Sequence, residues 1–152
     1  MNPRIAIGAL SLSAVAFGGL VAWEGFSDRA YYPVPGDKIT IGFGTTEGVK
    51  PGDTITAPKA VARALQDIAQ YEGAVKQCVR VPLHQREYDA YISLSYNIGP
   101  GAFCSSTLVR KLNAGDYAGA CTEILRWDRF QGKPLRGLTL RRQQEYRLCS
   151  TS

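Results

Sequence analysis

The chain begins with a long apolar stretch that ends beside an acidic residue. Residues 5–22 contain no charged side chain, and Glu24 follows almost immediately. A helix of about 20 apolar residues spans a bilayer, so this stretch approaches membrane length. Its many Ala, Gly and Ser residues make it only weakly hydrophobic. We therefore expect an N-terminal apolar helix that can enter a membrane and later leave it.

Other interpretations of this stretch remain open. Ala14-Val15-Ala16 resembles a signal-peptide cleavage site, and the stretch also suits a permanent anchor or a buried soluble helix. Cleavage after Ala16 would leave only seven residues ahead of Glu24. Seven residues are too few for a stable helix that presents this side chain. The weak, releasable anchor is therefore the interpretation we favour.

A turn-rich segment follows the apolar stretch and predicts a β-hairpin. Tyrosines at 31–32 favour a strand, and residues 33–37, Pro-Val-Pro-Gly-Asp, form a turn cluster. Residues 38–43 then alternate between polar and apolar side chains, as a half-buried strand does. Thr40 falls on the more polar side of this strand.

Helical spacing dominates the rest of the chain. In the first predicted helix the apolar residues expected to face the core are Val61, Leu65, Ile68 and Val75; in the second they are Tyr88, Tyr91, Ile92 and Tyr96. Caps and Gly-Pro breaks set the limits of the helices at about 56–76, 85–97, 105–111, 116–127 and 139–148, with a loop at 131–134. The pattern predicts a small N-terminal hairpin region followed by a helical bundle.

The charge balance narrows the range of partners. The chain has 152 residues and a net charge of +5, which suits one domain plus a terminal segment and favours anionic polymers or surfaces. Apart from Arg141-Arg142, no basic helix stands out, so nucleic acid is a poor candidate partner. We expect the protein to act as a monomer.

The cysteines argue for export and against a metal centre. Cysteines stand at 78, 104, 121 and 149 without a Cys-x-x-Cys pair, and His84 is the only histidine. A zinc site needs several such ligands at short spacing, so we expect no metal and no other cofactor. An even number of cysteines beside an export-like N-terminus favours disulfides, with three possible connectivities. We favour Cys78–Cys104 and Cys121–Cys149, and four reduced thiols are the alternative.

Three residues have side chains suited to cleaving a glycan. Such cleavage needs a proton donor at the leaving oxygen and a second group that stabilises the transition state or activates water. A carboxyl group partly desolvated beside Trp23 keeps its proton more readily, so Glu24 suits the acid role. Asp37 in the turn supplies a second carboxylate, and Thr40 suits holding a water. Taken singly, each residue also fits an ordinary structural role.

Two sets of motifs together resemble one family. Glu-Gly at 24–25, Ala-Tyr at 30–31 and Thr-Ile-Gly-Phe-Gly-Thr at 40–45 resemble the active-site signature of phage-type lysozymes, the glycoside hydrolase family 24 endolysins. The remaining motifs resemble the second half of the same family: Asn-Ile-Gly at 97–99, the run at 106–116, Arg-Trp at 126–127, Gly-Lys at 132–133, Gly-Leu at 137–138 and Arg-Arg at 141–142.

The resemblance assigns roles to particular positions. Glu24 matches the family's catalytic acid, and Thr40 matches its catalytic threonine. Where the family has Asp or Cys this chain has Pro33, so we assign the carboxylate role to Asp37 as a shifted equivalent. Glu47 is the alternative carboxylate.

Two further family positions carry expectations of their own. Thr45 stands where the family usually has His. Arg141 or Arg142 is a candidate to orient Glu24, although a solvated basic face is the interpretation we favour for this pair.

The resemblance implies a lysozyme-like fold, α+β and mostly helical, and the activity of a phage endolysin. It would hydrolyse the β-1,4 bond between N-acetylmuramic acid and N-acetylglucosamine in peptidoglycan and so lyse the host cell. The weak apolar N-terminus is similar to that of signal-arrest-release endolysins, which implies a segment at 1–23 and a catalytic domain at 24–152. Such a chain would be tethered, inactive, to the host inner membrane through residues 5–22 and then released, active, into the periplasm. A lytic transglycosylase using Glu24 alone and a non-catalytic, membrane-tethered wall-binding protein are the alternatives.

Overall fold

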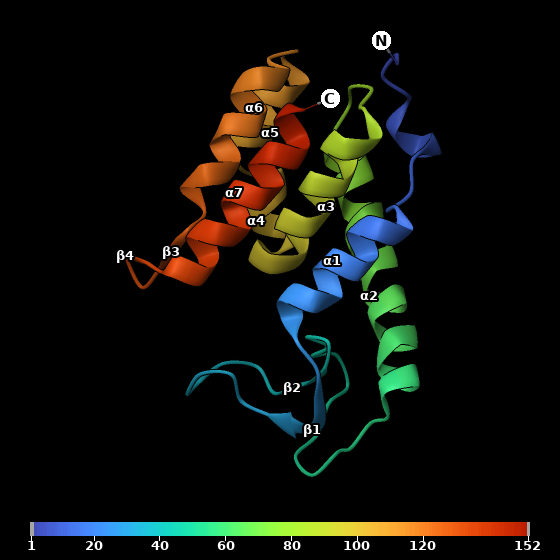
Figure 1. The fold of residues 1–152 in the computed structure, drawn as a ribbon, viewed down its shortest axis with the longest axis vertical. Helices are drawn as coiled ribbons and strands as arrows, with labels where there is room; N and C mark the ends of the chain where they lie inside the picture. The colour runs from blue at the N-terminus through green and yellow to red at the C-terminus, as the bar shows by residue number, and fades with distance from the viewer. Residues whose placement is uncertain (1, 152) are drawn as a thin grey trace. The chain divides into compact units, whose positions relative to one another are not determined.

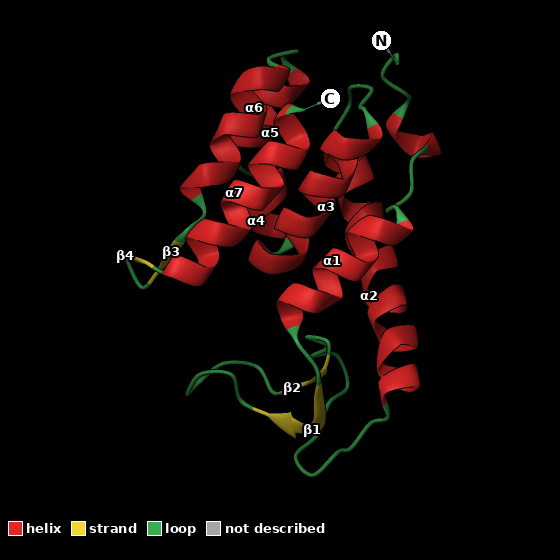
Figure 2. Cartoon of the chain, in the orientation of Figure 1, coloured by secondary structure: helices red, strands yellow, loops and turns green. Residues whose placement is uncertain are grey.

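The computed structural model describes residues 2–151 and divides the chain into two compact units. The first unit contains residues 1–16 and 71–152, and the second contains residues 17–70. Helices form most of the chain, and two short two-stranded sheets complete it (Figures 1 and 2). The predicted α+β class with a helical majority is confirmed.

The apolar N-terminal stretch does not form one continuous helix. A short 3-10 helix, η1, covers Ile7–Ala9, and α1 covers Ala14–Glu24. The Ser13 hydroxyl accepts the amide of Ala16 at 3.1 Å and so caps the start of α1. No helix within residues 2–151 is both long and apolar enough to cross a membrane.

Polar contacts bind residues 4–13 to the rest of the first unit. Ile5 and Leu83 exchange backbone hydrogen bonds of 2.8 and 2.9 Å. The Arg4 guanidinium contacts the buried Glu87 carboxylate at 3.0 Å. The Leu12 amide donates to Glu72 at 2.7 Å. These contacts explain why the stretch is interrupted. The backbone amides and carbonyls that a continuous helix would pair internally bind other residues of the same chain instead.

The second unit contains the predicted hairpin, but its first strand begins earlier and its second strand is shorter than expected. Strand β1 covers Ser27–Tyr31 and β2 covers Thr40–Gly42, paired antiparallel with Ser27 opposite Gly42. The alternation read from the sequence does not describe β2, since all three of its residues are buried.

Helix α2 (Ala57–Cys78) extends the predicted helix by two residues at its end. Ala60, Ala64 and Ile68 are buried, and their spacing of four residues places them on one helix face. Leu65, predicted to be in the core, is 52% exposed. It lies about 100° around the helix from Ala64, outside the buried face.

The first unit is a helical bundle around α3 (Gln85–Ile98), which packs against α7 (Arg136–Ser150). The four predicted core residues of α3 are all buried. The other helices are α4 (Pro100–Cys104), α5 (Thr107–Asn113), α6 (Tyr117–Glu123) and the 3-10 helix η2 (Ile124–Arg126). Helix α4 was not predicted. Gly99 ends α3 with φ 92°, and Pro100 then starts a new helix at the position where proline is tolerated.

The segment before α7 also differs from the prediction. Residues expected to form a plain loop make a hairpin of β3 (Arg129–Phe130) and β4 (Lys133–Pro134). Helix α7 begins at Arg136, so Thr139 is not its cap. The Thr139 hydroxyl instead donates to the Asp128 carboxylate at 3.0 Å. Thr139, which the sequence places at the start of the helix, therefore makes a tertiary contact from within the helix instead of capping it.

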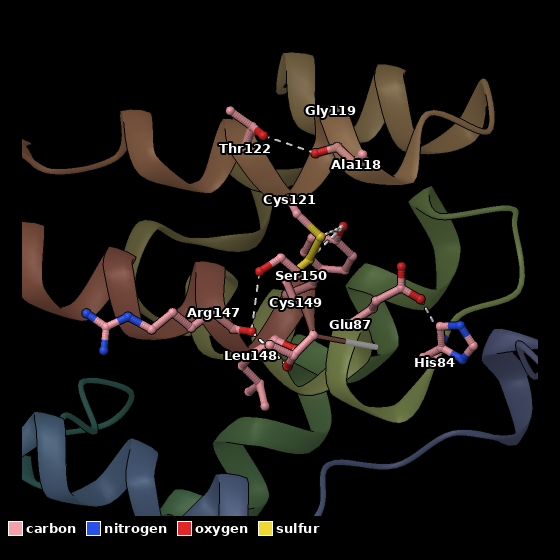
Figure 3. Close-up of a disulfide and its surroundings, with 12 residues drawn as sticks. His84, Glu87, Ala118, Gly119, Cys121, Thr122, Arg147, Leu148, Cys149 and Ser150 are labelled. Carbon is pink, nitrogen blue, oxygen red and sulfur yellow. Dashed lines mark hydrogen bonds between the residues drawn. A yellow bond between two sulfur atoms is a disulfide. The ribbon is translucent and has the colours of Figure 1, made fainter. Parts of the chain in front are cut away.

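Two disulfides join helices within the first unit. Cys78 pairs with Cys104, and Cys121 pairs with Cys149. The second bond connects α6 to α7, and both of its cysteines are buried (Figure 3). The favoured connectivity is confirmed.

Candidate active site

Glu24 is the last residue of α1 and lies in the second unit. Gly25 follows with φ 69°, a conformation that side-chain-bearing residues rarely adopt, and its amide bonds to Val21 at 3.0 Å. This glycine ends the helix, so the position of Glu24 is set by helix geometry on one side and by the path into β1 on the other. Glu24 is partly buried.

Asp37 occupies an exposed turn ahead of β2. Its amide donates to the Val34 carbonyl at 3.1 Å, and Gly36 has φ 83°. Pro35 followed by a glycine with positive φ is the sequence of a type II turn. The turn therefore presents the Asp37 carboxylate at the surface, where water and a polymer can reach it.

Asp37 and Thr40 are both bonded to the backbone of Lys38. The Asp37 carboxylate accepts the Lys38 amide at 2.8 Å, and the Thr40 hydroxyl donates to the Lys38 carbonyl at 3.1 Å. Thr40 is only 7% exposed, so it does not lie on a solvated strand face as predicted. The Lys38 backbone, which no sequence motif singles out, holds two candidate residues in one short segment.

The β1–β2 pairing links Glu24 to that segment. Glu24 precedes Ser27 by three residues, which limits their Cα separation to about 11 Å. Ser27 pairs with Gly42, and Thr40 pairs with Tyr31 at the other end of β1. The rings of Phe26 and Phe43 meet at 5.3 Å between centroids and reinforce the pairing. All three candidate residues thus belong to one compact unit, arranged around one small sheet.

Thr45, at the family's histidine position, has a structural role. It is 1% exposed, and its hydroxyl donates to the Asp67 carboxylate on α2 at 2.6 Å. Its amide and carbonyl both bond to Ile41. The residue therefore ties the loop after β2 to α2 rather than offering a titrating group to a substrate.

Glu47, the alternative carboxylate, is held against α2. Its carbonyl accepts the Arg63 guanidinium at 2.8 Å, and its carboxylate meets the Gln70 amide at 3.5 Å. The loop carrying Glu47 is thus attached to α2, whereas Asp37 is fixed to the segment that contains Thr40.

Arg141 and Arg142 do not form a solvated basic face. They are 5% and 0% exposed, and both approach the buried carboxylate of Glu145, Arg142 at 2.7 Å. Arg142 also donates to Asn97 at 2.7 Å. Burial raises the pKa of Glu145, while the two arginines and the Ser93 hydroxyl act against that rise. This charged cluster is part of the core of the first unit.

The described residues contain no group of three or more His, Cys, Asp or Glu arranged to hold a metal ion. The candidate residues Glu24, Asp37 and Thr40 offer two carboxyl groups and one hydroxyl.

Comparison with known proteins gives one consistent result. The family model described as phage lysozyme matches residues 21–145. An endolysin of Acyrthosiphon pisum secondary endosymbiont phage 1 is 44% identical over 134 residues, covering 86% of this chain and 91% of the relative. The SAR-endolysin of Enterobacteria phage P21 is 31% identical over 148 residues, covering 93% and 88%. The muramidase domain of SpmX from Asticaccaulis excentricus superposes with a TM-score of 0.86 at 30% identity, covering 94% of this chain and 99% of that domain.

The family match covers far more than half of the chain and includes all three candidate residues. This chain belongs to the phage lysozyme family and is a glycoside hydrolase of the lysozyme type.

Proposed function

We propose that the protein hydrolyses the β-1,4 bond between N-acetylmuramic acid and N-acetylglucosamine in peptidoglycan, using Glu24, Asp37 and Thr40. The observation that carries the proposal is the shared attachment of Asp37 and Thr40 to the Lys38 backbone. A carboxylate and a hydroxyl held on one segment suit the binding of a single water.

Each residue has one step in this mechanism. Glu24 donates its proton to the glycosidic oxygen as the bond to the leaving sugar breaks. Asp37 accepts a proton from the attacking water, and Thr40 orients that water. Because water attacks directly, the anomeric carbon inverts, and the carboxyl groups of Glu24 and Asp37 stand roughly 6.5–9.5 Å apart in the substrate complex.

Muralytic assays of Glu24→Gln, Asp37→Asn and Thr40→Ala test these assignments. Removal of a general acid or base is expected to lower turnover by about 100- to 10,000-fold for the two carboxyl variants. Asp28→Asn, an exposed strand residue of the second unit, is the matched control and should retain activity. An active Asp37→Asn combined with an inactive Glu47→Gln would transfer the carboxylate role to Glu47.

Analysis of the released sugars separates hydrolysis from its nearest alternative. A reducing muramic end with inverted configuration supports the water mechanism. An anhydro-muramic end would mean that Glu24 acts alone as a lytic transglycosylase.

We also propose that location controls this activity, with residues 1–23 as the regulatory segment and residues 24–152 as the catalytic domain. In the tethered state residues 5–22 lie in the host inner membrane. After release into the periplasm they adopt the folded arrangement, in which residues 4–13 bind the first unit and α1 carries Glu24. Two observations support this proposal: the interrupted helix and the similarity to a SAR-endolysin.

Gly18→Leu/Gly19→Leu tests control by release. A Cβ at either position meets no atom within 4 Å, so the folded state can accept larger side chains. Leucine favours the membrane, so the variant is expected to stay in the membrane fraction and fail to lyse cells. Gly18→Ser/Gly19→Ser is the matched control and should be released normally. Normal release and an unchanged lysis time in the leucine variant would contradict the proposal.

A further inference from the structure

The β3–β4 hairpin and the start of α7 expose large apolar side chains beside cations. Phe130, Leu135 and Leu140 are 42%, 45% and 46% exposed. In Figure 1 this hairpin projects from the helices of the first unit at the start of α7. We define the hairpin surface as these three residues with three exposed cations of the same segment: Arg129, Lys133 and Arg136.

Local geometry gives the hairpin surface a fixed form. The connection Gln131-Gly132 has φ 51° and 79°, which is the sign pattern of a tight type I′ turn. Phe130 pairs with Lys133 across the hairpin, so their side chains share one side of the ribbon. On α7, Arg136 and Leu140 are four residues apart and share one helix face. Apolar and cationic groups therefore alternate over a short, turn-stabilised projection.

The net charge of the protein is concentrated in this region. Residues 126–147 contain seven Arg or Lys and two Asp or Glu, a net charge of +5 that equals that of the whole chain. Arg141 and Arg142 are buried with Glu145 and do not contribute to the surface. Arg129, Lys133 and Arg136 make no ion pair with any residue from 2 to 151.

The nearest acidic group in sequence, Asp128, makes no ion pair with these cations among residues 2–151. The Asp128 carboxylate accepts the Thr139 hydroxyl at 3.0 Å. The positive charge of the hairpin surface is therefore available to a partner.

This combination selects one chemical class of partner. A soluble anion would satisfy the cations but would leave three large apolar side chains in water. A glycan strand offers few anionic groups to the cations and no environment for leucine. The surface of an anionic bilayer satisfies both, because phosphates attract the cations and the boundary of the acyl chains accepts the apolar groups. We propose that the hairpin surface binds the surface of an anionic lipid bilayer, as a contact separate from residues 5–22.

Vesicle binding of the full chain tests the proposal. The vesicles are phosphatidylethanolamine with or without phosphatidylglycerol, and the measured quantity is the ratio of binding to anionic and neutral vesicles. Arg129→Gln/Lys133→Gln is expected to lower this ratio by about 25-fold, since each cation at such a surface contributes about five-fold. Phe130→Ser/Leu135→Ser is expected to weaken binding to the anionic vesicles.

Matched variants elsewhere control for general effects. Lys50→Gln/Lys59→Gln removes the same charge from exposed positions, and Leu65→Ser removes an equally exposed apolar group. These controls should bind as the unmodified protein does, and residues 5–22 are common to every variant. Turnover on soluble wall fragments should be unchanged throughout, which separates this contact from catalysis.

Two results would overturn the proposal. One is an unchanged binding ratio in the charge variant together with unchanged binding of the apolar variant to anionic vesicles. The other is retained vesicle binding combined with lost binding to lipid-free sacculi, which would identify the wall polymer as the partner.

Discussion

At the residue scale, Gly42 combines an unusual backbone conformation with a close neighbour. Its φ is 65°, and a Cβ added there would lie 3.1 Å from the Cβ of Ala60. We expect Gly42→Ala to lower the free energy of unfolding by about 1–3 kcal/mol, measured by urea denaturation. Gly48→Ala is the matched control, because Gly48 has φ 72° and open space around it. Equal losses in the two variants would show that the contact with Ala60 contributes nothing.

Thr45 illustrates how a family position can change its role. Its hydroxyl donates to the Asp67 carboxylate at 2.6 Å, and the residue is almost fully buried. Thr45→Val keeps the shape but removes the donor, which should destabilise the protein by about 1–3 kcal/mol. Thr45→Ser keeps the hydroxyl and is expected to lose less. A valine variant as stable as the unmodified protein would contradict this assignment.

At the element scale, the start of α1 depends on a carboxylate of α3. Asp89 accepts the Ser13 amide at 3.0 Å, the Ser13 hydroxyl at 2.7 Å and the Gln85 amide at 2.9 Å. We expect Asp89→Ala to cost about 1.5–3 kcal/mol, because bonds to a charged acceptor are lost. Amide hydrogen exchange should accelerate at residues 13–16 in particular. If exchange there is unchanged, another contact holds this end of α1.

The ion pairs of Glu123 predict that the stability of the protein depends on pH. The Lys111 and Arg126 side chains donate to Glu123 at 2.8 and 3.0 Å, and these bonds lower the pKa of Glu123 below its ordinary value of 4.5. The folded state then binds this proton less readily than the unfolded state. The resulting stabilisation is fully present above pH 4.5 and is lost as the pH falls through the lowered pKa. Glu123→Gln should reduce the loss of unfolding free energy at acidic pH, measured by denaturation at a series of pH values. If that loss is the same in the variant, Glu123 does not contribute to it.

The elements differ in how far the sequence defines them. The helices at 57–78 and 85–98 were predicted closely because their apolar spacing is periodic and their ends carry local signals. Residues 5–22 are apolar throughout and so have no periodicity that places a break. The interruption is set by distant partners, among them Leu83 and Glu72. Ser13 was the one local signal available, as a small hydroxyl residue at the N-cap of α1.

At the scale of the whole molecule, the candidate site was only partly predictable. Motif spacing identified Glu24 and Thr40, and chain order alone placed Asp37 near the latter. The bonds of both side chains to Lys38 involve backbone groups, which no pattern of side chains reveals. Glu145 follows Arg141 and Arg142 at helical spacing on α7, but the contact of Arg142 with Asn97 on α3 forms only in the folded unit.

The disulfides allow a prediction for the whole first unit. Their sequence separations are 26 and 28 residues, so loop entropy alone predicts nearly equal contributions of about 3.5 kcal/mol. The environments differ, because Cys121 and Cys149 are 3% and 2% exposed, whereas Cys78 and Cys104 are half-buried. Replacing the buried pair by alanine also leaves unfilled volume, which adds a packing cost.

We therefore expect Cys121→Ala/Cys149→Ala to destabilise the protein more than Cys78→Ala/Cys104→Ala, in thermal and urea unfolding. Reduction of the unmodified protein without substitution removes the cross-links but retains the side-chain volume, so it isolates the loop term. If the two double variants lose equal stability, packing around the α6–α7 bond contributes little, and the cross-links act on the unfolded chain alone. Either result bears on lysis, since such bonds form only in an oxidising compartment and would stabilise the first unit there.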